Sequence, residues 1–238
     1  MIELKNITFE RDGKKILDDV SLKIDEDKFI VITGPNGSGK STLTKIIMGI
    51  EKQDSGEIYF NGKEITNLSI DERAKLGIAY AFQQPVKFKG LTVYELIKLS
   101  AGKEIKKAEA CNILSKVGLC AKEYVDREIN ASLSGGELKR IEIAMVAARK
   151  AALTIFDEPE AGIDLWSFNH LINVFEDMIK ETKGITMIIS HQERILDIAD
   201  KIVLVDSGKI KKVGTKEEVM PLVLGNKICC KLGGSIDG

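Results

Sequence analysis

The distribution of apolar and polar residues along this chain predicts an α/β fold. Three short runs, at residues 29–32, 151–156 and 184–190, are apolar on both faces, as in strands buried within a parallel sheet. The N-terminal segments 2–9 and 16–24 have the pattern of further strands. Between about residues 71 and 146 the apolar positions recur mostly with the helical period, which predicts a mainly helical insert.

Turn residues predict two hairpins. Asn61-Gly62 lies between two short strand-like runs and supplies the positive φ angles of a type I′ turn. Ser207-Gly208 has the same place in a second hairpin at residues 202–214. A helix is predicted at about 165–182, and the weakly patterned, glycine-rich residues 226–238 are expected to form a flexible tail.

Composition and charge exclude several classes of protein. Of the 238 residues, 44% are hydrophobic and 30% are charged, which is enough to build a core and a polar surface. The 36 acidic and 35 basic residues leave no overall basic field, so we expect no nucleic-acid partner. No apolar run approaches the roughly 18–20 residues that span a bilayer, and the N-terminus lacks a signal pattern. We therefore expect a cytoplasmic protein.

The strongest chemical signal is a glycine-rich loop that follows the first buried strand and precedes a helix. Its sequence GPNGSGKS fits a phosphate-binding loop, in which glycines let main-chain N–H groups surround a polyphosphate. We expect Lys40 to reach the β- and γ-phosphates and the Ser41 hydroxyl to bind Mg²⁺. A glycine-rich turn without a ligand would not require this strand and helix. The predicted nucleotide-binding residues are Gly34, Pro35, Asn36, Gly37, Ser38, Gly39, Lys40, Ser41 and Thr42.

An acidic pair ends the second buried strand. Asp157 and Glu158 should therefore lie at the carboxyl edge of the sheet, where α/β proteins bind ligands. Taken alone, the pair could be an acidic strand end without a function. With the phosphate loop present, we expect Asp157 to hold Mg²⁺ through water and Glu158 to act as the general base for an attacking water.

A second anion site is predicted about 100 residues after the first. Ser134 precedes a helix and should cap it, while Gly135 and Gly136 leave the backbone open to a phosphate. A single nucleotide bound to one chain would not need both anion sites. Two chains arranged head to tail would use both, with each ATP between one chain's Lys40 loop and the other chain's Ser134 loop. The pattern therefore predicts an ATP-dependent homodimer.

The order of these motifs resembles that of the ATP-binding-cassette (ABC) ATPases. GPNGSGKST, AFQQP, LSGGE, FDEP, AGID and ISH occur in that family's order, over about residues 1–215. The resemblance implies the P-loop NTPase fold of ABC ATPases, with a mixed or parallel core sheet, an antiparallel β subdomain and a helical subdomain. It also implies that Gln83 links Mg²⁺ to a partner protein, that Asp164 signals across the dimer, and that His191 contacts the γ-phosphate and orients water.

The same resemblance suggests one ABC ATPase domain in several parts. Residues 1–83 and 147–225 would form the nucleotide-binding core with its β subdomain. Residues 84–146 would form the helical subdomain with the Ser134 motif, and 226–238 the tail. The expected cofactors are ATP and Mg²⁺, and the expected metal ligands are Ser41, Gln83 and Asp157.

Four stretches look like the SufC-type ATPases of iron–sulfur cluster assembly. They are GIAYAFQQPVKFKG, LSGGELKRIEIAMVAA, DEPEAGIDLWSF and SHQERILDIADKI. This similarity implies a soluble SufB/SufD-like scaffold as the partner. The alternative is the nucleotide-binding subunit of a membrane ABC transporter, in which the motif usually reads LSGGQ and continues with a run like RVAIARAL. A chromosome-maintenance ATPase is disfavoured, because the chain has no sustained heptad pattern.

Three further assignments concern single residues. The family usually places an aromatic residue near the first strand to stack on adenine. Here Arg11 falls at that position, with Phe9 two residues away, and Arg11 could equally be a solvated turn residue. His170, the second histidine, is expected to be structural or on the surface. Cys229-Cys230 are expected to be reduced thiols on a mobile end rather than metal ligands.

Overall fold

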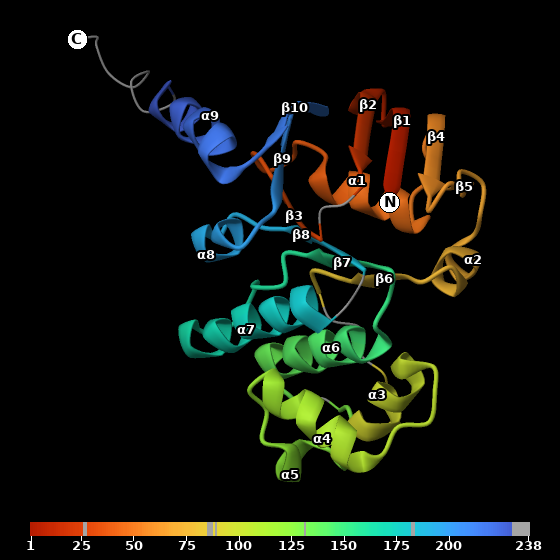
Figure 1. Cartoon of the computed structure of the whole chain (residues 1–238), viewed down its shortest axis with the longest axis vertical. Helices are drawn as coiled ribbons and strands as arrows, with labels where there is room; N and C mark the ends of the chain where they lie inside the picture. Colours follow the sequence, from red (N-terminus) through yellow and green to blue (C-terminus); the bar gives the residue numbers. More distant parts are fainter. Residues whose placement is uncertain (26–27, 85–87, 89, 131, 182–183, 230–238) are drawn as a thin grey trace. The chain divides into compact units, whose positions relative to one another are not determined.

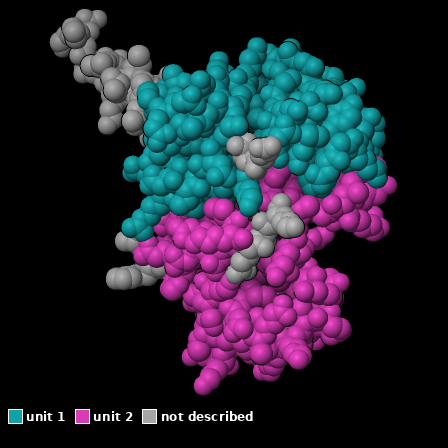
Figure 2. Space-filling model, in the orientation of Figure 1, with its two compact units in different colours: residues 1–67, 191–238 teal, residues 68–190 magenta. Residues whose placement is uncertain are grey.

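A computed structural model describes residues 1–25, 28–84, 88, 90–130, 132–181 and 184–229. It divides the chain into two compact units (Figure 2). Unit 1 comprises Met1–Asn67 and His191–Gly238, and unit 2 comprises Leu68–Ser190. Each unit contains strands and helices, and both are described separately below.

Unit 1 contains an antiparallel sheet with the strand order β2-β1-β4-β5 (Figure 1). Apolar side chains line one face of its two long strands, as expected from their pattern. The turn between β4 and β5 has positive φ angles at Asn61 and Gly62, as predicted. The strands are β1 Ile2–Arg11, β2 Lys14–Ile24, β4 Ser55–Phe60 and β5 Lys63–Glu64.

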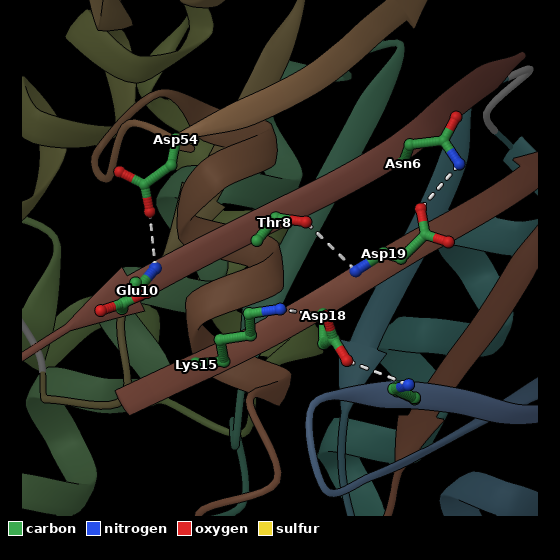
Figure 3. A network of polar contacts seen from close by, with 8 residues as sticks. Asn6, Thr8, Glu10, Lys15, Asp18, Asp19 and Asp54 are labelled. Carbon is green, nitrogen blue, oxygen red and sulfur yellow. Dashed lines mark hydrogen bonds and ion pairs between the residues drawn. The ribbon is translucent and has the colours of Figure 1, made fainter. Parts of the chain in front are cut away.

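Irregular positions in β1 and β2 are held by polar side chains (Figure 3). Asn6 and Asp19 both have left-handed φ angles, near breaks in the β1–β2 register. The Asn6 side-chain amide donates to Asp19 Oδ1 at 2.7 Å, and the Asp19 main-chain N–H donates to Thr8 Oγ1 at 3.2 Å. The second of these bonds satisfies a main-chain donor that a regular ladder would have paired.

Unit 1 also contains a three-stranded group in which β9 pairs parallel with β3 and antiparallel with β10. All five residues of β3 are buried, as the two-sided apolar pattern predicted. The elements are β3 Phe29–Thr33, α1 Lys40–Met48, α8 Glu193–Asp197, β9 Lys201–Asp206, β10 Lys209–Gly214 and α9 Lys216–Cys229.

Unit 2 is built on three parallel strands, with β7 paired to β6 on one side and to β8 on the other. Every residue of β7 and β8 is buried, again as predicted. Helix α6 packs against β6 and also against α3 and α4 (Figure 1). The elements are α2 Ile70–Lys75, β6 Ile78–Ala81, α3 Val93–Ala101, α4 Lys107–Lys116, α5 Ala121–Tyr124, α6 Gly135–Arg149, β7 Leu153–Asp157, α7 Leu165–Glu181 and β8 Ile185–Ile189.

The structure adds two elements that the sequence pattern did not indicate. Strand β6 lies inside the segment expected to be helical, because a run of four apolar residues has too few positions to show its period. Helix α9 continues to Cys229, so residues 226–229 of the expected tail are helical. The glycine at position 225 lowers helix propensity by only about 1 kcal/mol and does not end the helix. Residues 230–238, including Cys230, lie outside the described residues.

None of the described helices combines the length and the apolar composition that crossing a bilayer requires. The three-part division of the chain into core, helical subdomain and tail remains a prediction.

Asp200 connects segments of unit 1 that are far apart in the sequence. Its carboxylate Oδ2 accepts hydrogen bonds from the main-chain N–H groups of Lys28 and Phe29, both at 2.8 Å. Its own N–H donates to Phe29 O at 2.9 Å. This cluster aligns the starts of the parallel strands β3 and β9, and β3 leads directly into the phosphate loop.

Replacing Asp200 by Ala should therefore lower the free energy of unfolding by about 2–3 kcal/mol, because two main-chain donors lose a charged acceptor. Urea unfolding measures the effect. Asp25→Ala is the matched control, since Asp25 forms an exposed ion pair with Lys23 at 3.0 Å, a type of contact that contributes little to stability. Equal stabilities of the two variants would contradict this role for Asp200.

Candidate active site

The predicted phosphate loop lies between the end of β3 and the start of α1. Gly34 has a φ of 139°, and a Cβ added there would lie 1.8 Å from the main-chain oxygen of Val205. Gly39 precedes the first residue of α1 with a φ of 101°, and its added Cβ would lie 2.8 Å from Ile16 O. Both positions therefore require glycine for steric as well as conformational reasons.

The β9–β10 turn holds the loop against β2. Gly208 donates its N–H to Ser38 O at 3.1 Å and accepts from the Asp18 N–H at 2.9 Å. Lys209 and Lys15 lie 2.9 and 3.1 Å from the Asp18 carboxylate and hold its pKa below the usual value (Figure 3). Because both hydrogen bonds of Gly208 join main-chain atoms, the turn sets the position of the loop.

The loop fits an anion. Helix α1 starts with main-chain N–H groups that have no acceptor within the helix, and no side-chain cap satisfies them. Among the described residues, Ser38 Oγ is buried without a hydrogen-bond partner. A Cβ at Gly37 would have no atom within 4 Å, so space remains beside the loop. The buried Lys40 donates its ammonium hydrogens to Gly34 O at 2.7 Å and Pro35 O at 2.9 Å.

His191 lies at the start of this loop within unit 1. It is exposed, and its Nδ1 is 3.3 Å from Thr33 Oγ1, at the end of β3. The histidine that the sequence analysis assigned to the site thus contacts Thr33, the residue directly before the phosphate loop. His170 is exposed on α7, and its ring lies about 3.0 Å from where a Cβ at Gly118 would be. This position fits its expected structural or surface role.

In unit 2, the acidic pair follows β7 as predicted. Asp157 is 3% exposed and accepts a hydrogen bond from the Tyr80 hydroxyl at 3.0 Å. Glu158 has a left-handed φ of 47°, and its N–H donates to Ile189 O at 3.1 Å. The Gln83 side-chain amide donates to Glu158 Oε2 at 2.5 Å. The structure therefore brings together two of the predicted site residues, Gln83 and Glu158.

Hard oxygen donors are available for Mg²⁺. The three residues expected to hold it carry a hydroxyl, an amide and a carboxylate, which are the donor types that this ion binds. They are Ser41, Gln83 and Asp157. The donor set therefore fits the cation.

Ser134 caps helix α6, as predicted. Its Oγ accepts the Glu137 N–H at 3.3 Å, and its N–H donates to Glu137 Oε2 at 2.6 Å, which completes a capping box. A hydrogen bond from the Tyr124 hydroxyl, followed by the one from the Ser134 N–H, lowers the pKa of Glu137. The exposed Gly135 has open space where a Cβ would lie. This helix start is therefore accessible to a further molecule.

Asp164 has a local role that its motif did not predict. Its carboxylate accepts hydrogen bonds from Ser167 N at 3.0 Å and Ser167 Oγ at 2.7 Å at the start of α7. Asp164 therefore supports the beginning of that helix. Its expected signalling across a dimer remains a prediction.

Sequence reasoning missed Thr33 and Tyr80, which contact predicted site residues. Each is a polar side chain at the end of an apolar strand, and that position was the available signal. For adenine stacking, Phe9 is 7% exposed and Arg11 lies over its ring at 5.5 Å. Arg11 also pairs with Glu51 at 2.7 Å. It lies in β1, not in a turn, and it is the exposed member of the two.

Comparisons with known proteins identify the family. A model of the ABC transporter family matches residues 17–161. An uncharacterized ABC transporter ATP-binding protein of Methanocaldococcus jannaschii is 36% identical over 227 residues, covering 92% of this chain and 90% of the relative. The spermidine/putrescine import ATP-binding protein PotA of Mesoplasma florum is 35% identical over 92% of this chain, which spans 63% of that relative.

A solved structure supports the same conclusion. A dimeric ATP-binding cassette in a post-hydrolysis state, bound to ADP and Pi, matches with a TM-score of 0.80 and 25% identity, covering 90% of this chain and 98% of that one. The chain therefore belongs to the ABC transporter family, and it is an ATPase that uses ATP and Mg²⁺. Its α/β fold is that of the ABC ATPases, as predicted.

The contacts of Gly39 lead to a test. Gly39→Ala should cost about 3 kcal/mol of stability, because a Cβ would meet the Ile16 oxygen and the backbone would be strained. Gly37→Ala should cost only about 1 kcal/mol, because Gly37 has a positive φ but open space around it. Urea unfolding without nucleotide compares the two variants. A smaller loss for Gly39→Ala than for Gly37→Ala would contradict the proposed packing of the loop.

Proposed function

We propose that this chain is the ATP-hydrolysing subunit of an ABC transporter, and that two copies dimerise on ATP to move a partner. The observation that carries this proposal is the presence of two helix starts suited to phosphate, at α1 and α6. The first has the buried Lys40 and the unpaired Ser38 hydroxyl. The second has an exposed Ser134-Gly135 step with open space beside it.

The proposed roles follow from the chemistry of each residue. Residues 34–42 bind the phosphates of ATP, with Lys40 neutralising their charge. Ser41, Gln83 and Asp157 hold Mg²⁺, which when bound neutralises the phosphate oxygens. Glu158 accepts a proton from the attacking water and His191 orients that water at the γ-phosphate.

The dimer would be held together by ATP itself. In this proposal Ser134, Gly135 and Gly136 of one copy bind the γ-phosphate held by the other copy, and Asp164 communicates between them. The contacts form only while the γ-phosphate is present, so hydrolysis releases them. The dimeric state named for the related cassette supports this arrangement.

A groove in unit 2 offers the partner a docking place close to Gln83. It has a volume of about 170 Å³ and is lined mostly by apolar side chains from β6, α3 and α6. The neighbouring Phe82 and Phe88 are 36% and 39% exposed. We propose that an apolar segment of the membrane subunit lies in this groove, because the names of both curated relatives denote ATP-binding subunits of transport systems.

A SufC-like role in iron–sulfur cluster assembly is the second candidate. It rests on the four sequence stretches described above, in which Glu137 replaces the glutamine of the usual transporter motif. The names of the relatives give it no support. Under this candidate the groove would take a SufB/SufD-like scaffold instead of a membrane protein. The absence of a nucleic-acid partner and the cytoplasmic location remain predictions.

Replacing Glu158 by Gln should lower kcat for ATP hydrolysis by about 10²–10⁴, because the amide keeps the shape but cannot accept the proton. ATP should still bind, and the dimer should accumulate on gel filtration with Mg²⁺-ATP. Turnover at the wild-type rate would contradict the role given to Glu158.

Two control variants sharpen this experiment. Glu160→Gln changes a nearby glutamate whose Oε1 accepts a hydrogen bond from Ser190 Oγ at 2.6 Å, and it should keep kcat within a few-fold. Ser134→Arg should bind ATP but remain monomeric, because the larger side chain blocks the second phosphate site. A monomeric Glu158→Gln variant in ATP would contradict the shared site.

Filling the groove should separate partner binding from hydrolysis. Ser100→Arg places a long side chain in the groove and should weaken partner binding at least tenfold, while basal ATPase activity stays unchanged. Ser115→Arg, on the exposed side of α4, is the matched control. Affinity purification from membrane and soluble fractions identifies the partner. A partner without membrane spans would favour the iron–sulfur candidate, and equal capture by both variants would exclude the groove.

A further inference from the structure

Helix α6 carries an ion pair between the buried Lys139 and the partly buried Glu142, neither of which has been assigned a role so far. Lys139 is 1% exposed, and its ammonium lies 3.2 Å from Glu142 Oε2, one helical turn along. The ammonium also donates hydrogen bonds to the main-chain oxygens of Phe82 and Gln83, the latter at 3.2 Å. Glu142 Oε1 accepts the main-chain N–H of Phe82 at 3.0 Å. The pair therefore binds three main-chain groups of two consecutive residues.

A contribution to the free energy of unfolding does not by itself explain why a charged pair occupies these two positions. Burial raises the pKa of the Glu142 carboxyl, while the neighbouring Lys139 opposes this change. Replacing a buried ion pair by apolar residues of similar volume is often neutral or stabilising. Both side chains point to the backbone that directly follows β6, since both bond main-chain groups there. A different constraint must favour the charged pair here.

The segment held by this pair carries Gln83. It follows β6 directly, and no strand partner holds Phe82 or Gln83 among the described residues. The Gln83 side chain in turn donates to Glu158 Oε2 at 2.5 Å. The Lys139–Glu142 pair thus fixes the backbone from which the Gln83 amide reaches the glutamate proposed as the general base.

We propose that Lys139 and Glu142 form a positioning clamp that holds the Phe82–Gln83 backbone so that the Gln83 amide orients Glu158. The inference rests on the function proposed above for Gln83 and Glu158. Both clamp residues act through Gln83 and contact no reacting atom, so they are positioning residues and not catalytic ones.

The test separates positioning from packing by replacing one partner or both. Lys139→Met and Glu142→Leu each leave a buried charge without its partner, so each should lower Tm by about 5–10 °C. The double variant removes both charges, so its Tm should return most of the way to the wild-type value. Its kcat should nevertheless stay at least about tenfold below wild type, with KM for ATP nearly unchanged, because the clamp remains absent.

Three further measurements complete the test. Amide hydrogen exchange at Phe82 should be at least tenfold faster in the double variant, because its N–H has lost the Glu142 acceptor. In a Gln83→Ala background the double substitution should lower kcat no further. The control Lys180→Met with Glu176→Leu removes an exposed pair of the same residue types on α7 and should change neither Tm nor kcat.

Wild-type kcat in the double variant, or a loss of kcat that adds fully to that of Gln83→Ala, would overturn the clamp. A wild-type chain without Mg²⁺-dependent ATPase activity would instead overturn the proposed function. In that case unchanged hydrogen exchange at Phe82 in the double variant would also exclude the clamp as a constraint on this backbone.

Discussion

Main-chain N–H groups can bind a polyphosphate only if their loop is held in one conformation. A loop free to change its conformation would bond these N–H groups to its own carbonyl oxygens. In this chain the restraint comes from neighbouring backbone. Gly34 lies against the Val205 oxygen and Gly39 against the Ile16 oxygen, so neither position can carry a side chain. Gly208 adds a hydrogen bond to Ser38 O. The β9–β10 turn and strand β2, distant in sequence, thus determine the geometry of the loop and the direction of the α1 N-terminus.

Much of this arrangement could be predicted from the sequence. Strands β3, β7 and β8 are apolar on both faces, and Ser134 is a good helix cap, so local pattern was sufficient for them. Strand β6 was missed because four residues show no period. No helix was predicted over residues 216–229, because the segment contains Pro221 and Gly225, which both lower helix propensity.

The contacts around the site residues were harder to predict, because they depend on tertiary neighbours. Nothing local to Gln83 indicates that Lys139, more than fifty residues later, bonds its main-chain oxygen, or that Glu142 accepts the N–H of the preceding residue, Phe82. A charged pair one turn apart on a helix usually indicates a solvated face, and only burial shows otherwise. The identity of the partner protein could not be predicted from the motifs either, because the same residues bind ATP whichever partner the ATPase acts on.

The left-handed backbone of Glu158 has a consequence for how this enzyme can change. A residue with a side chain pays about 1–2 kcal/mol for that conformation, whereas glycine adopts it freely. Substitution by glycine would relieve this strain but would also remove the carboxylate and its hydrogen bond from Gln83. The backbone therefore carries strain at the position of the carboxylate proposed as the general base, so the demands of activity and of stability oppose each other there.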